Sequence, residues 1–117
     1  MIPNPKPDWW PATAEVADST VNVSGLDPKL ISFLAAAASH HANAYGKPLV
    51  VTSADDGTHA SGSKHYQRKA VDIRSRELSM AEQHDFARWL SDVQELYQLG
   101  VFDERFIGAP HWHVEVA

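Results

Sequence analysis

The stretch SKHYQRKAVDI, residues 63–73, joins a polar segment to a short apolar run. The alternation of Val71 and Ile73 with their neighbours predicts that the run AVDI is a strand. His65 and Asp72 flank the start of this strand and lie seven positions apart. Both are good metal ligands. The stretch therefore predicts a loop that leads into a strand, with two candidate ligands at the junction.

A helix is predicted before this stretch, over residues 28–45. Asp27 is a suitable N-cap, and Gly46 ends the helix. Apolar residues at helical spacing form its predicted buried face: Ile31, Leu34, Ala35, Ala38, Ala42 and Tyr45. His40 and His41 fall in the last turn, where a cation interacts favourably with the helix dipole, and we expect both at the surface.

The remaining elements complete an α+β pattern. Residues 48–53 and 70–73 are predicted strands, and a capping box opens a helix over 79–98. The predicted core stripe of this helix is Phe86, Leu90, Val93 and Tyr97. Two more strands are predicted at 100–104 and 111–116. We expect an α+β fold in which two helices pack on a small, largely antiparallel sheet.

Length and composition predict one folded domain. A chain of 117 residues, 44% of them hydrophobic, suits a single core. We expect residues 27–117 to form this domain. Residues 1–26, which are rich in proline near the start, are expected to form an arm or an edge strand laid over it. Trp9 and Trp10 are predicted to anchor the arm on the core, because large aromatic side chains dominate buried contacts.

Charge and cysteine content exclude several classes of partner. The formal net charge is −5 and cationic residues are not clustered, which argues against nucleic acid or an anionic membrane surface. The chain lacks cysteine, so a transition metal must be held by His, Asp or Glu. Neither a signal peptide nor a run of about 18 apolar residues is present, so we expect no membrane span.

The last predicted strand, HWHVEV, carries a second group of polar side chains. His111, His113 and Glu115 should project from one face, because successive side chains on a strand alternate between faces. Alone, this pattern could be a solvent-exposed face. Together with His65 and Asp72 it offers histidines and an aspartate, a set that suits Zn²⁺ and leaves a position open for water. Water in such a site is acidified towards a pKa of about 7.

These motifs resemble those of the zinc metallopeptidases that trim peptidoglycan stem peptides. The resemblance is carried by Ser63-x-His65, then Ala70-Val71-Asp72-Ile73, and a terminal His111-x-His113. The family contains D-Ala-D-Ala carboxypeptidases and L-Ala-D-Glu endopeptidases, and shares its fold with the hedgehog signalling domain. The longer stretch VTSADDGTHASGSKHYQRKAVDI is most similar to the hedgehog version. The resemblance covers residues 27–117.

The resemblance assigns roles to individual residues. It implies three zinc ligands: His65, Asp72 and His113. His111 would position or stabilise the reacting group beside them. The residues expected to face the substrate are His59, Tyr66 and Arg68.

The chain departs from the family at the catalytic acid. The carboxypeptidases place an acid at the position of Pro110, and hedgehog-like spacing places it at Ile107. Glu104 is our first choice for this role, with Glu115 and Asp103 as alternatives. Glu115 could instead orient a histidine ligand.

Two further departures concern glycine and arginine. Arg68 stands where the peptidases usually have glycine, and Asp56 stands where they carry an arginine that binds a substrate carboxylate. Arg68 or Lys64 could supply that positive charge from another direction.

These patterns leave three alternatives, of which two are functions and one is a protein without a metal. The first is a monomeric zinc peptidase that cleaves peptidoglycan peptides in the cell wall. The second is a hedgehog-like zinc-binding module with weak or no hydrolytic activity. The third is a protein of the same fold whose histidines are merely exposed.

Overall fold

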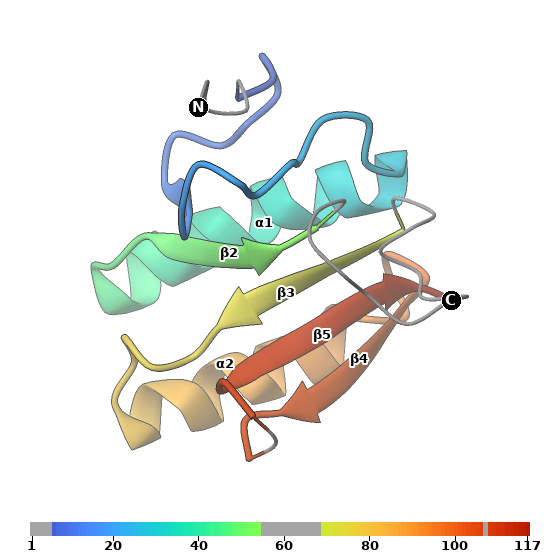
Figure 1. The fold of residues 1–117 in the computed structure, drawn as a ribbon. Coiled ribbons are helices and arrows are strands. Elements are labelled where there is room, and N and C mark those ends of the chain that lie inside the picture. The colour runs from blue at the N-terminus through green and yellow to red at the C-terminus, as the bar shows by residue number, and fades with distance from the viewer. Residues whose placement is uncertain (1–5, 55–68, 107) are drawn as a thin grey trace.

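The computed structural model describes residues 6–54, 69–106 and 108–117. These residues form an α+β fold with two helices and five strands, shown in Figure 1. In chain order the elements are β1 (Ala14–Val16), α1 (Pro28–Tyr45), β2 (Leu49–Ser53), β3 (Ala70–Arg74), α2 (Met80–Val93), β4 (Leu99–Glu104) and β5 (His111–Val116).

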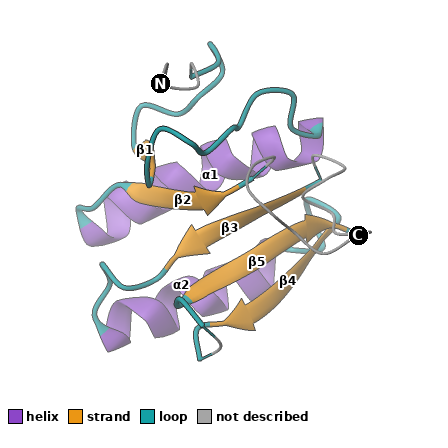
Figure 2. Cartoon of the chain, viewed as in Figure 1, coloured by secondary structure: helices purple, strands orange, loops and turns teal. Residues whose placement is uncertain are grey.

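The strands form one mixed sheet in the order β1-β2-β3-β5-β4. Strand β1 runs parallel to β2, and the other neighbouring pairs are antiparallel. Both helices cover the same face of this sheet, α1 behind β2 and α2 behind β4 and β5 (Figures 1 and 2). The expected arrangement of two helices on a largely antiparallel sheet is therefore confirmed. No helix in the described part of the chain is long and apolar enough to cross a membrane.

Helix α1 has the predicted ends but a rotated buried face. The Asp27 side chain accepts a hydrogen bond from the Lys29 N–H, and Gly46 adopts the left-handed conformation at the C-cap. The buried residues are Leu30, Phe33, Leu34, Ala37, Ala38 and His41. The predicted stripe was wrong at Ala35, which is exposed. It included Leu34 and Ala38 but omitted the other buried residues, Leu30, Phe33, Ala37 and His41.

The expectation that His41 lies at the surface was wrong. Its side chain is 2% exposed and packs edge-on against the rings of Tyr45 and Phe86. Its Nδ1–H donates a hydrogen bond to the Lys47 carbonyl at 2.7 Å, which satisfies the buried ring. His40 is partly exposed and stacks on Trp89 at 4.8 Å between ring centroids.

Helix α2 begins as predicted and ends earlier than predicted. Ser79 and Glu82 form a reciprocal capping box at its start. The helix ends at Val93, and the expected extension to residue 98 is wrong. Turns follow instead, and Gln98 has a φ of 56°, so the chain leaves the helical path before β4. Within the predicted stripe Phe86 and Leu90 are buried, and the last two positions are half-buried.

The segment before α1 is built into the sheet and the core. Strand β1 pairs with β2 at the sheet edge, and Trp9 and Trp10 pack against the buried cluster. The Trp10 Nε1–H donates to the Ala14 carbonyl at 2.9 Å. The expected anchoring by the two tryptophans is confirmed.

Candidate active site

Strand β5 divides its side chains between the two faces of the sheet. Apolar side chains are buried under the helices, and the largest of them, Trp112, packs against Phe86 of α2. The residues that project from the other face, which we term the distal face, are His111, His113 and Glu115. The prediction that these three residues share one face is confirmed.

The register of β3, β5 and β4 places side chains of the distal face in three rows across the sheet. Each row runs from β3 through β5 to β4: Arg74–His111–Glu104, Asp72–His113–Phe102 and Ala70–Glu115–Gly100. Five ionisable residues of these rows form what we term the histidine cluster: Asp72, Glu104, His111, His113 and Glu115. Residues from three separate parts of the sequence thus meet on one surface.

His113 lies between two carboxylates. Its Nδ1 is 2.9 Å from Asp72 Oδ1, and its Nε2 is 2.8 Å from Glu115 Oε1. The hydrogen bond to Asp72 raises the pKa of His113, and the contact with Glu115 adds to this effect against the opposing effect of burial. The doubly protonated ring is the form that donates to both carboxylates. A metal bound by His113 must therefore displace one of these protons.

His111 is oriented by the backbone. Its Nδ1–H donates to the Ala109 carbonyl at 2.7 Å. Its Nε2 then faces Glu104 Oε1 at 2.9 Å, with Asp72 Oδ1 at 3.8 Å. Because the carbonyl can only accept, it fixes which nitrogen faces the cluster. Nε2 is therefore the nitrogen of His111 that faces Glu104.

The three candidate acids lie in different environments. Glu104 contacts His111, and Glu115 contacts His113, so both belong to the histidine cluster. Asp103 is separated from it, because it alternates with Glu104 along β4 and lines a cavity on the helix side. The hydrogen bonds from Arg105 hold the pKa of Asp103 below its usual range. This geometry favours Glu104 and Glu115 over Asp103.

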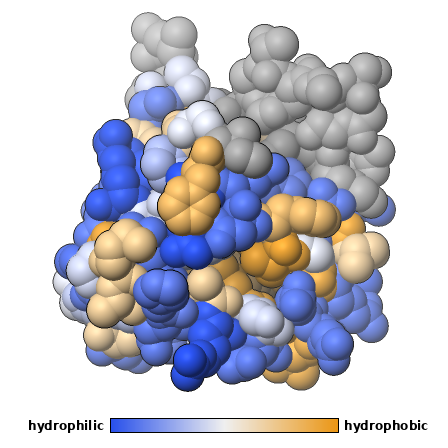
Figure 3. Space-filling model, turned by 90° about the horizontal axis from the view of Figure 1, so that it is seen from below, coloured by the Kyte–Doolittle hydropathy of each residue, from blue (hydrophilic) through white to orange (hydrophobic). Residues whose placement is uncertain are grey.

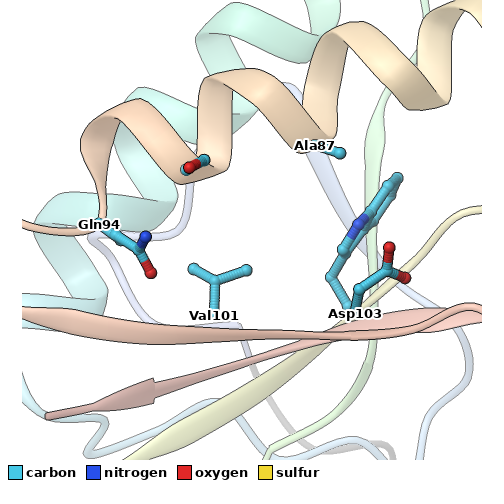
Figure 4. A pocket seen from close by; sticks show the side chains of 6 residues that line it. Ala87, Gln94, Val101 and Asp103 are labelled. Carbon is cyan, nitrogen blue, oxygen red and sulfur yellow. The ribbon is translucent and has the colours of Figure 1, made fainter.

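The cavity beside Asp103 has a volume of about 190 Å³ and lies between α2 and β4 (Figure 4). Its lining residues are Ala87, Ser91, Gln94, Val101, Asp103 and Trp112. The sheet separates it from the histidine cluster. It is therefore distinct from the candidate active site.

Several residues singled out in the sequence lie outside the described residues. They are Asp56, His59, Ser63, Lys64, His65, Tyr66 and Arg68, together with Ile107. Of the three expected zinc ligands, Asp72 and His113 are described, and they are in contact.

The ligand atoms of Asp72 and His113 are of the types that bind zinc. Asp72 offers carboxylate oxygen and His113 offers imidazole nitrogen, both of which bind Zn²⁺ in proteins. Across residues 6–54, 69–106 and 108–117, no group of three or more His, Asp or Glu side chains is arranged to hold a metal ion. The described part of the chain thus provides a pair of candidate ligands, and a complete site needs at least one ligand more.

A small pocket lined by two arginines borders His111. It has a volume of about 80 Å³, and its lining residues are Thr52, Arg74, Arg76, Ala109, Pro110 and His111. Arg74 forms an ion pair with Glu77, and the Arg76 Nε lies 3.7 Å from the same carboxylate. We term this the rim pocket.

The rim pocket and Phe102 were not anticipated from the sequence. A signal for the arginines exists in the Arg74-Ser75-Arg76 alternation, which extends the distal face of β3 past its last residue. For Phe102 the signal is its position two residues before Glu104 in a predicted strand, which puts both on one face.

Comparisons of this chain with protein-family models, curated proteins and solved structures gave no match.

Proposed function

We propose that this chain is a zinc-dependent peptidase that hydrolyses peptidoglycan stem peptides, of the D-Ala-D-Ala carboxypeptidase or L-Ala-D-Glu endopeptidase type. The observation that supports this most is a pair of contacts side by side on the distal face. Asp72 contacts His113, and His111 contacts Glu104. The first contact joins two candidate metal ligands, and the second joins two groups able to move protons.

Asp72 and His113 would hold the zinc ion together with His65, which the family resemblance supplies. When bound, zinc acts as a Lewis acid that polarises a carbonyl group and lowers the pKa of water. Glu115 would fix the orientation of His113, since its carboxylate contacts the ring.

Glu104 and His111 would manage the protons of the reaction. Hydrolysis adds the oxygen of water to the carbonyl carbon, breaks the C–N bond and leaves one proton of that water on the released amine. Glu104 would accept this proton and return it to the amine, and the contact of its carboxylate with His111 supports this role. His111 Nε2, which contacts Glu104, would stabilise negative charge on the carbonyl oxygen as a hydrogen-bond donor.

The rim pocket suits a substrate carboxylate. The peptidases of the family use an arginine that this chain lacks at the matching position, where Asp56 stands. Arg74 at the end of β3 and Arg76 in the turn after it line the pocket beside His111 instead. Guanidinium groups bind carboxylates through charge-assisted hydrogen bonds.

A hedgehog-like zinc-binding module is the second candidate function. The observation that favours it is the environment of Pro110, which stands where the carboxypeptidases carry their acid. Pro110 lines the rim pocket and its carbonyl accepts a hydrogen bond from the Ser75 N–H at 3.4 Å. Pro110 thus makes a structural hydrogen bond and offers no ionisable group. All proton transfer would then depend on Glu104 and His111.

Cleavage of defined peptides tests the proposal. The zinc-loaded protein is incubated with a stem pentapeptide that ends in D-Ala-D-Ala, and the products are identified by mass spectrometry between pH 5 and 9, a range of about two units on each side of the expected water pKa. Release of D-Ala identifies a carboxypeptidase, and a cut between L-Ala and D-Glu identifies an endopeptidase. A protein that holds zinc and leaves the peptide intact throughout this range would favour the binding module.

A further inference from the structure

Phe102 brings an aromatic ring to the edge of the histidine cluster. It lies on the distal face of β4, directly opposite His113 in the pairing with β5. The ring centroids of Phe102 and His113 are 5.9 Å apart, at an interplanar angle of 54°. The Phe102 side chain is 50% exposed, so one side of the ring remains available to a ligand.

Gly100 makes room for this ring. A Cβ atom added at Gly100 would lie 3.3 Å from Phe102 Cε2 and 3.7 Å from Glu115 Cγ. The ring therefore lies beside Gly100, and Cγ of Glu115 borders the same space. These contacts hold the ring on the distal face next to His113.

The setting of Phe102 differs from that of the other exposed apolar side chains. Met80, Leu96 and Phe106 are also exposed. On the side of the molecule drawn in Figure 3, apolar side chains reach the surface among hydrophilic ones. Single exposed apolar residues are common and need no function. Phe102 alone among these four contacts a residue of the histidine cluster.

We infer that Phe102 is the specificity wall of the active site, against which a neutral, apolar side chain of the substrate peptide packs beside the cleaved bond. The inference rests on the proposed peptidase function. An apolar substrate side chain would cover the exposed side of the ring and remove it from water. An acidic substrate side chain would instead have to give up its hydration against this apolar ring.

The test compares Phe102→Ala with Phe106→Ala as a matched control. Phe106 is 82% exposed, and its ring contacts the Arg105 guanidinium rather than the histidine cluster. The zinc-loaded protein is given two peptide substrates that are identical except for alanine or glutamate at the residue before the cleaved bond. The readouts are kcat/KM for each peptide and saturation-transfer NMR from the protein to the alanine methyl group.

The wild type is expected to prefer the alanine peptide. Phe102→Ala should lower that preference by about 5- to 10-fold, in line with the loss of one or two buried methyl contacts, and should remove saturation transfer to the methyl group. Phe106→Ala should leave both unchanged. Phe102→Leu, which keeps an apolar side chain, should retain part of the preference and so guards against a variant that merely folds poorly.

The two proposals fail in different ways. If the wild type binds the alanine peptide without cleaving it, the peptidase proposal fails and the NMR comparison alone decides the role of Phe102. If Phe102→Ala keeps the preference and the methyl signal within about twofold of the wild type, or if the wild type shows no methyl signal, the specificity wall is refuted.

Discussion

His113 Nδ1 lies 2.9 Å from Asp72 Oδ1 across the antiparallel pairing of β3 with β5, although 41 positions separate the two residues in the sequence. The register that sets this contact also places Trp112 opposite Ile73 on the helix side. A slip of one residue would turn His113 towards the core and Trp112 towards the distal face. The burial of Trp112 therefore fixes the position of the candidate ligand pair, and the core and the site are specified together.

The first prediction concerns zinc content. The purified protein is expected to bind about one zinc ion per chain, because three histidine and aspartate ligands make a site of catalytic type. His113→Ala and Asp72→Asn should each lose most of the metal, since they remove one partner of the 2.9 Å pair. Metal analysis of the dialysed proteins measures this. Chelation should lower the melting temperature of the wild type, because metal binding stabilises the folded state.

His84→Ala is the control for the zinc measurement. His84 is exposed on α2, on the side of the sheet opposite the histidine cluster. It should keep full zinc content. Equal zinc in the wild type and in both His113→Ala and Asp72→Asn would disprove the ligand assignment.

The second prediction concerns the catalytic acid. Glu104→Gln should retain zinc and the fold while lowering kcat on a stem peptide by about 10²-fold or more, because a positioned acid or base contributes about 10²- to 10⁴-fold. Glu115→Gln should act mainly on metal affinity, since Glu115 contacts His113 and not His111. Steady-state kinetics and zinc titration of both variants separate the two roles.

Asp103→Asn is the matched control for these variants. Asp103 neighbours Glu104 in β4, but it faces the helix-side cavity and pairs with Arg105. Its loss should leave kcat unchanged within about twofold. A Glu104→Gln protein that turns over as fast as the wild type would move the acid role to Glu115 or His111.

Local signals in the sequence predicted the ends of α1 and the faces of β5. Asp27 and Gly46 act within one turn of the helix, and the alternation in HWHVEV needs no distant partner. Asp72 and His113 were chosen as candidate ligands through the family resemblance, because strand alternation alone does not distinguish His113 from His111.

Contacts between distant segments could not be read in this way. His41 is buried because Phe86 of α2 packs against it, and helical spacing in α1 alone carries no record of that neighbour. The rim pocket forms because the Pro110 carbonyl meets the Ser75 N–H, which brings the turn before β5 beside Arg74 and Arg76. Tertiary packing decides both features.

The third prediction concerns the rim pocket. Arg76→Ala should raise KM for a peptide with a free terminal carboxylate by about tenfold, which corresponds to the loss of one charge-assisted hydrogen bond. KM for the same peptide with an amidated terminus should stay unchanged. Kinetics on the peptide pair measure the difference. Arg88→Ala, which alters an exposed arginine on α2, is the control and should affect neither peptide. Equal effects of Arg76→Ala on both peptides would rule out a carboxylate contact.

The last prediction concerns the buried histidine of α1. Burial lowers the pKa of His41 below its usual value of 6.5, against the raising effects of the Lys47 carbonyl and the charges of Glu77 and Glu82. The unfolded chain therefore binds a proton at this residue at a higher pH than the folded chain does. The stabilisation that neutral His41 gives to the folded state is fully present at pH values above the pKa of His41 in the unfolded chain. It is lost as the pH falls through 6.5 towards the lower pKa of His41 in the folded chain.

His41→Phe should remove this dependence on pH. The variant keeps a ring between Tyr45 and Phe86 but loses the hydrogen bond to the Lys47 carbonyl, so we expect it to be less stable at pH 8 by about 1 kcal/mol. Between pH 7.5 and pH 5.5, a span of about one unit on each side of the usual histidine pKa, the stability of the wild type should fall more steeply than that of the variant. Urea unfolding at a series of pH values measures both slopes. His113, whose pKa is raised, contributes with the opposite sign in both proteins and so cancels in the comparison. Parallel slopes for the two proteins would show that His41 titrates alike in the folded and unfolded chains, contrary to its burial beneath α2.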